Sequence, residues 1–194
     1  MATPSNRPMT YRMDLPGGQV RLRELVLYIA QKCAEAEYFG LTKLNKILWR
    51  ADFEAYADRE MPVTGRAYQR LQFGPAPTEM RPLLSEMADS GLIDIEERPV
   101  NGELTEKRVR IKDQQPSLYF FSDDDIDYVD RAINYYWSKT GKETSDDSHG
   151  IAWKILSDLD PMPYEFARLS DALIPSTQLE RLKSIGQEEG WRSQ

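Results

Sequence analysis

The chain has 194 residues, of which 40% are hydrophobic and 29% are charged, and its formal net charge is −7. This length suits a single domain, and no stretch approaches the roughly 18 uninterrupted apolar residues of a membrane span. With one histidine and one cysteine, the chain excludes a zinc site of the usual Cys/His kind and an intramolecular disulfide framework.

The N-terminal third predicts an arm followed by two helices. The first 18 residues are polar, contain three prolines and end in Gly17-Gly18, which predicts a flexible arm. Helical spacing of apolar residues predicts a buried helix from Val20 to Ala36, with Cys33 packed as a small hydrophobe. Thr42 is expected to cap a second helix, which Met61-Pro62 closes. Its inward stripe is Leu44, Ile47, Leu48, Ala51 and Ala55, and its other face carries Lys43, Lys46 and Arg50.

The middle of the chain predicts a β-hairpin after a third helix. Residues 66–73 alternate weakly, as a strand with Ala67, Gln69, Leu71 and Phe73 on one side or as one short helix, and periodicity leaves both open. Gly74-Pro75-Ala76-Pro77 breaks the chain, and Thr78 is expected to cap a helix that ends at Ser90-Gly91. That helix turns Met80, Leu83, Leu84 and Met87 inward. Residues 92–96 and 107–111 both alternate apolar with polar residues around Asn101-Gly102, which indicates a hairpin.

The last third predicts further helices. Ser122 with Asp125 resembles a capping box before a helix whose apolar face is Ile126, Val129, Ile133, Tyr136 and Trp137 and which Gly141 ends. Another helix is expected over 146–157, then a break at 160–163 and two short helices near 164–171 and 176–186. The fold is therefore predicted to be mainly α, a compact helical domain with a small winged-helix-like β-hairpin. Residues 1–18 form the arm, 19–175 the single domain and 176–194 a C-terminal helix or tail.

Charge and motifs narrow the function. Residues 1–112 carry 17 Lys and Arg against 16 Asp and Glu, whereas residues 113–194 carry 8 against 16. This acidic excess disfavours binding to nucleic-acid phosphates and favours a basic protein partner, although solubility alone would also explain it. The chain has no Walker loop, no dinucleotide-binding glycine motif and no nucleophile elbow. Because these motifs are missing, we expect a protein that is not an enzyme and needs no metal or cofactor. We also expect it in the cytoplasm, because one cysteine indicates a reducing compartment and the N-terminus has no secretory core.

Three local patterns, in order, resemble one family. They are Leu41-Thr-Lys-Leu-Asn-Lys-Ile-Leu-Trp49 with Met61-Pro62, then Gln72-Phe73-Gly74-Pro75, and then Ser148-His149 with Trp153. Over roughly residues 22 to 155 the chain resembles the Panacea domain, the SocA-like antitoxin domain of bacterial and phage toxin–antitoxin loci. One departure is Phe73, where the family commonly has tyrosine. The resemblance implies an antitoxin that neutralises a cognate protein toxin by direct contact, and some members deliver the toxin to an ATP-dependent protease.

Each candidate contact residue also has a structural interpretation. Lys43, Lys46 and Arg50 could grip an acidic patch or form a solvated helix face. Trp49 could anchor an interface or pack half-buried. Tyr68, Phe73, Gly74 and Pro75 could shape a turn or line a groove. His149 could titrate near neutral pH or be satisfied within the core, and Trp153 could be exposed or buried. We expect the contact surface to include the helix from Leu44 to Phe53 and the loop from Phe73 to Pro77.

Two other functions are weighed against the antitoxin. A winged-helix DNA-binding regulator would use Lys107, Arg108, Arg110 and Lys112 of the hairpin on phosphates, but its reading helix carries Glu79, Glu86 and Asp89 against Arg81. A carboxylate hydrolase would use Asp52 and Glu54, whose i, i+2 spacing directs them to different faces of a helix. The sequence favours the protein-binding antitoxin over both.

Overall fold

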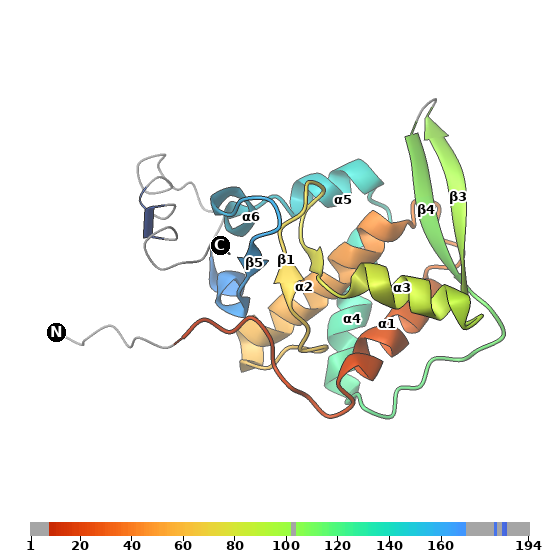
Figure 1. The fold of residues 1–194 in the computed structure, drawn as a ribbon, viewed down its shortest axis with the longest axis horizontal. Helices are drawn as coiled ribbons and strands as arrows, with labels where there is room; N and C mark the ends of the chain where they lie inside the picture. Colours follow the sequence, from red (N-terminus) through yellow and green to blue (C-terminus); the bar gives the residue numbers. More distant parts are fainter. Residues whose placement is uncertain (1–7, 102–103, 170–180, 182–183, 186–194) are drawn as a thin grey trace.

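The structure is a computed structural model that describes residues 8–101, 104–169, 181, 184 and 185. In this part of the chain there are six α-helices, five strands and one 3₁₀ helix (Figure 1). In chain order they are α1 (Gln19–Lys32), α2 (Leu41–Arg59), β1 (Tyr68–Gln69), β2 (Ala76–Pro77), α3 (Met80–Asp89), β3 (Ile93–Asn101), β4 (Leu104–Ile111), α4 (Asp123–Tyr136), α5 (Gly141–Asp147), α6 (Ile151–Ile155), β5 (Pro161–Met162) and the 3₁₀ helix η1 (Tyr164–Arg168).

The predicted class is confirmed, but one detail of it is not. The chain is mainly α, and β3 pairs with β4 in an antiparallel hairpin whose register sets Ile93 opposite Ile111. A winged-helix-like arrangement is not confirmed, because β1 and β2 lie between α2 and α3 and form a separate antiparallel sheet of order β2-β1-β5. In Figure 1 the hairpin lies at the right of the view, whereas β1 and β5 lie toward the left.

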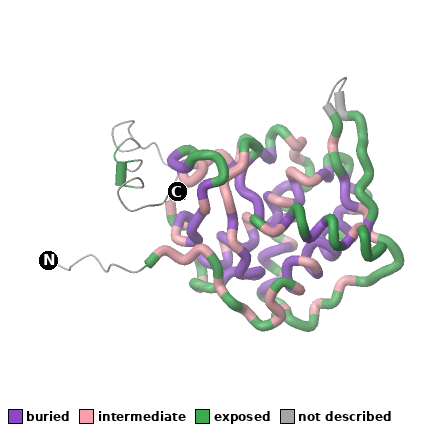
Figure 2. The backbone as a smooth tube through the Cα atoms, viewed as in Figure 1, coloured by how far each residue is buried: buried purple, intermediate pink, exposed green. Residues whose placement is uncertain are grey.

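Helix α2 runs through the middle of the molecule (Figure 2). None of its residues from 41 to 57 is exposed, and the predicted stripe is fully buried. That stripe packs with α1, α3, α4 and the base of the hairpin in the main core. A second, smaller core contains Phe53, Tyr56, Tyr68, Ile155, Leu156, Met162, Tyr164 and Phe166. Each fully buried large apolar side chain contributes about 1.5–3 kcal/mol, so α2 fixes the elements on both of its sides.

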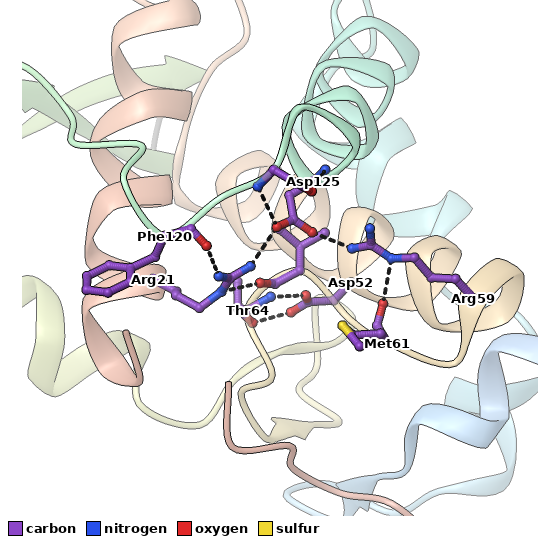
Figure 3. A network of polar contacts seen from close by, with 9 residues as sticks. Arg21, Asp52, Arg59, Met61, Thr64, Phe120 and Asp125 are labelled. Carbon is purple, nitrogen blue, oxygen red and sulfur yellow. Dashed lines mark hydrogen bonds and ion pairs between the residues drawn. The ribbon is translucent and has the colours of Figure 1, made fainter. Parts of the chain in front are cut away.

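A buried ion-pair network joins α1, the end of α2 and the start of α4 (Figure 3). Asp125 accepts hydrogen bonds from Arg21 Nη2 at 2.9 Å and from Arg59. Arg21 also donates to the carbonyl oxygens of Val63, at 2.6 Å, and Phe120. Burial raises the pKa of Asp125, but hydrogen bonds from Arg59, the Ser122 amide and Arg21 outweigh it, so the pKa lies below the ordinary value.

The turn after α2 is held by a second buried carboxylate. Asp52 accepts hydrogen bonds from the Thr64 amide at 2.5 Å, from the Thr64 hydroxyl and from the Tyr68 hydroxyl at 2.8 Å. Burial raises the pKa of Asp52 to about 6, although all of these hydrogen bonds act to lower it. As predicted, α2 ends before Met61-Pro62: its last residue is Arg59, and Glu60 caps it in the left-handed region with φ 58°.

Several predicted helix boundaries are wrong. Gly40 and Glu79 precede α2 and α3 without a side-chain cap, so Thr42 and Thr78 are not the caps. The capping box of Ser122 and Asp125 at α4 is confirmed. Gly141 does not end a helix but begins α5, because Thr140 forms a further capping box there.

The helix expected over 146–157 is interrupted. The Ser148 amide and hydroxyl both donate to the Ser145 carbonyl, at 3.0 and 2.7 Å, and α6 begins only after Gly150. Serine side chains that bond to the backbone compete with helical hydrogen bonds. Trp137, expected on the inward face of α4, is 45% exposed because α4 ends at Tyr136.

The ambiguous segment 66–73 contains only a two-residue strand, β1, and no helix. Tyr68 in β1 pairs with Pro77 and Met162 and is buried, whereas Phe73 is exposed. The prediction of one strand with Ala67, Gln69, Leu71 and Phe73 on the same side is therefore wrong, because only Tyr68–Gln69 is a strand and Phe73 lies in the turn after it. Its segment leaves the strand after Gln69 and turns back into β2.

The division into arm, domain and tail stays a prediction. Of residues 8–18, Met13 donates from its amide to Gly65 O at 2.9 Å, and Thr10 N donates to Glu165 Oε2 at 2.9 Å. The helix predicted near 164–171 corresponds to η1, and the one predicted over 176–186 falls largely outside the described residues. In the part of the chain that the structure describes, no helix is long and apolar enough to cross a membrane.

Candidate functional site

The two lysines of the α2 signature are buried, so the prediction of a solvated helix face is wrong for them. Lys43 and Lys46 are each 1% exposed, because α2 is covered on this side as well. Lys46 Nζ donates to Pro75 O at 2.8 Å, and Lys43 Nζ donates to Trp137 O at 3.3 Å. Burial lowers the pKa of both, that of Lys46 to about 7. Among the described residues, no carboxylate forms an ion pair with either lysine.

The Gly-Pro segment forms a tight turn directly over Lys46. We call residues 71–75 the Phe73 turn. Gly74 N donates to Leu71 O at 2.9 Å, and Gly74 has a φ of +93°, a conformation that favours glycine. A Cβ at Gly74 would overlap Ser148 Oγ and would lie 2.6 Å from Lys46 Cε. The turn leaves Phe73 62% exposed at its tip.

The α5–α6 corner packs against the same turn. His149 stacks on Trp153 with ring centroids 3.8 Å apart and planes 20° apart. Trp153 Nε1 donates to Leu71 O at 2.8 Å, and the Arg70 guanidinium lies 4.0 Å from the Trp153 ring. Burial, followed by the nearby charge of Lys46, lowers the pKa of His149, so the ring is neutral at neutral pH.

The other predicted residues of α2 belong to the second core and its edge. Phe53 and Tyr68 are buried against each other, with centroids 5.4 Å apart, so both are structural. Trp49 is half-buried beside Phe53, and its indole Nε1 has no hydrogen-bond partner among the residues that the structure describes. Arg50 lies between the Tyr135 ring, 3.5 Å away, and Glu54, with which it forms an ion pair of 2.6 Å.

A pocket of about 170 Å³ lies where α2, α5, α6 and η1 meet. Charged side chains and an apolar wall line it: Trp49, Arg50, Phe53, Glu54, Ala57, Asp147, Ser148, Gly150, Ile151, Ala152, Phe166, Ala167 and Leu169. Ser148 therefore lies beside both the pocket and the Phe73 turn.

The structure divides the predicted site residues into groups. Lys46, Gly74, Pro75, His149 and Trp153 meet around the Phe73 turn. Trp49, Arg50 and Phe53 line the pocket, whereas Lys43 faces the end of α4.

Sequence reasoning missed Arg70 and Leu159. Leu159 N donates to Arg70 O at 2.8 Å, and Leu159 is 60% exposed with a φ of 67°. Neither residue has a local sequence signal, because their proximity depends on how distant segments fold together.

The matched part of the chain identifies its family. A family model described as "Antitoxin SocA-like, Panacea domain" matches residues 44–154. The chain belongs to this family. No curated protein and no solved structure shows significant similarity to it. The match spans the Panacea residues that meet in the structure, from Lys46 through the Phe73 turn to Trp153.

The residues weighed for other functions are engaged elsewhere. Lys107, Arg110 and Lys112 form ion pairs with acidic residues of the opposite strand, and Arg108 is buried and donates to the Cys33 and Ala34 carbonyls. Asp52 is fully buried and Glu54 pairs with Arg50. Within the described ranges, no three His, Cys, Asp or Glu side chains are grouped as ligands for a metal ion.

Proposed function

We propose that this Panacea protein is the antitoxin of a toxin–antitoxin pair, and that it neutralises its toxin by binding rather than by catalysis. The contact would use the Phe73 surface, defined as Arg70, Phe73, His149, Trp153 and Leu159. Family membership supports the antitoxin role. One observation carries the choice of surface: an aromatic side chain stands 62% exposed at the tip of a turn that is fixed from several sides.

Two physical reasons support this surface. Interface hot spots are enriched in aromatic residues and arginine, and the surface contains Phe73, Trp153 and Arg70. A turn that is already held in one conformation loses little conformational entropy on binding, which increases affinity. The Phe73 turn has this property because Leu71 O accepts hydrogen bonds from Gly74 N and from Trp153 Nε1.

The test is co-expression with the product of the adjacent gene, read as rescue of growth and as co-purification at high salt. Phe73→Ala should weaken the complex about 30-fold, as expected for a hot spot worth about 2 kcal/mol. The matched control is Tyr119→Ala, an 86% exposed aromatic residue on the loop before α4. A harmless neighbour or no complex would refute the antitoxin role, and equal affinities of the two variants would refute the choice of surface.

Delivery of the toxin to an ATP-dependent protease in the cytoplasm is a separate part of the proposal. A simple blocker protects the bound toxin, whereas an adaptor accelerates its degradation. Toxin half-life with and without the antitoxin, in cells with and without the protease, distinguishes the two. We do not propose DNA binding, because the cations of the hairpin are held in ion pairs or buried.

A further inference from the structure

The burial of the Lys46 ammonium group is energetically unfavourable. Burying an ammonium group costs several kcal/mol unless an opposite charge or several hydrogen bonds compensate it. Lys46 has one hydrogen bond in the described structure, to Pro75 O, and no carboxylate partner there. An unbranched apolar side chain of similar length would fill the same space without that cost. Such a side chain would leave the buried Pro75 carbonyl without its donor, so the two effects on stability oppose each other, and stability of the fold alone does not explain a lysine at this position.

Lys46 lies against two residues of the Phe73 turn, Pro75 and Gly74. Pro75 is buried and has a carbonyl but no N–H, and Lys46 Nζ is the donor that satisfies this carbonyl. Gly74 rests on the lysine stem and on Ser148, where a Cβ would not fit. The turn is thus held by α2 from below, while Trp153 holds it at Leu71 O.

We propose that Lys46 is a positioning residue, which holds the Phe73 turn on α2 so that Phe73 is presented to the toxin. Lys46 does not touch the partner itself, since it is buried beneath Gly74 and Pro75. The role in toxin binding rests on the proposed function, whereas the role in holding the turn depends only on the structure.

The decisive variant is Lys46→Met, which keeps the length of the side chain and removes the donor and the charge. We expect a folded protein whose unfolding midpoint in urea at pH 7 is unchanged or raised. The turn should become less ordered. Hydrogen exchange of the Gly74 amide and chymotrypsin cleavage after Phe73 should then both be about 10-fold faster. Toxin affinity should fall about 10-fold, because the turn must then be ordered on binding.

The matched control is Lys43→Met, the other buried lysine of α2, which donates to Trp137 O instead of the turn. It should leave cleavage after Phe73 and toxin affinity unchanged. A merely structural Lys46 would lower the unfolding midpoint and the affinity together, and an unfolded Lys46→Met protein would likewise overturn the proposal.

Two further results separate this proposal from the antitoxin assignment. Unchanged exchange and cleavage in Lys46→Met would show that the lysine does not hold the turn, whatever the toxin does. A loosened turn with unchanged toxin affinity would show that the turn is not the contact that Lys46 serves. If the wild-type protein binds no toxin, the proposed function fails, and the positioning role in toxin binding fails with it. Hydrogen exchange at Gly74 and cleavage after Phe73 would still report whether Lys46 holds the turn.

Discussion

Asp125 allows the strongest test of the energetics of this fold. Its carboxylate is buried between Arg21 and Arg59 and also accepts from the Ser122 amide at 3.1 Å, closing the capping box of α4 (Figure 3). Asp125→Ala leaves the buried Arg21 without its counter-charge, and breaking such a pair costs about 3–5 kcal/mol. For a chain of this length the melting temperature should fall by about 10 °C.

The pH dependence adds a second criterion. The folded-state pKa of Asp125 lies below its unfolded value of 3.8, so its contribution is present above that value and is lost as the pH falls through the folded pKa. Urea unfolding at several pH values should therefore show a large difference in unfolding free energy between wild type and Asp125→Ala at pH 7, and this difference should become smaller toward pH 2. The control is Asp124→Ala, an exposed acid in the same helical turn, with an effect below about 1 kcal/mol. The reasoning would be refuted if the two variants lost the same unfolding free energy at pH 7. It would also be refuted if the difference between wild type and Asp125→Ala stayed as large in acid.

Three further predictions follow from buried groups. The pKa of Lys46 is lowered from 10.5 to about 7, so between these pH values the unfolded chain binds more protons than the folded one, and the unfolding free energy rises with pH. Lys46→Met should remove about 2 kcal/mol of this rise between pH 7 and 9, measured by unfolding in urea. Gly74→Ala combines a φ of +93° with overlap onto Ser148, so its unfolding free energy should fall by about 2 kcal/mol or more, and a fall below about 0.5 would contradict this geometry. Burial raises the pKa of Cys33 to about 11 against an ordinary 9.0, so its reaction with a disulfide reagent at pH 8 should be about 100-fold slower in the native protein than in urea, and equal rates would contradict its burial.

Periodicity predicted the parts of the fold that local sequence determines. The apolar stripe of α2, the helix that became α1 and the capping box of α4 all follow from residues close together in the chain. The hairpin followed from two alternating segments around a turn signal. These features were predictable because their main interactions are within one element or between adjacent ones.

What could not be predicted depends on distant segments. A lysine on the outer face of an amphipathic helix is normally solvated, whereas Lys46 is buried where the Phe73 turn folds back over it. The break between α5 and α6 arises where Ser148 bonds back to Ser145 O and packs under Gly74, and neither contact has a periodic signal. Arg70 reaches Trp153 for the same reason.

The three motifs that carried the family resemblance meet at one place in the structure. Lys46 comes from the α2 signature, Gly74 and Pro75 from the turn signature, and Ser148 from the segment before His149. The close contact between these three segments requires three features: a donor beneath the Pro75 carbonyl, a residue without Cβ at Gly74, and a small hydroxyl side chain at Ser148. These motif residues therefore build and hold the Phe73 turn, and all four of them are buried. Recognition of a particular toxin would then depend on the exposed side chains that the turn presents, Phe73 first among them, rather than on the motif residues themselves.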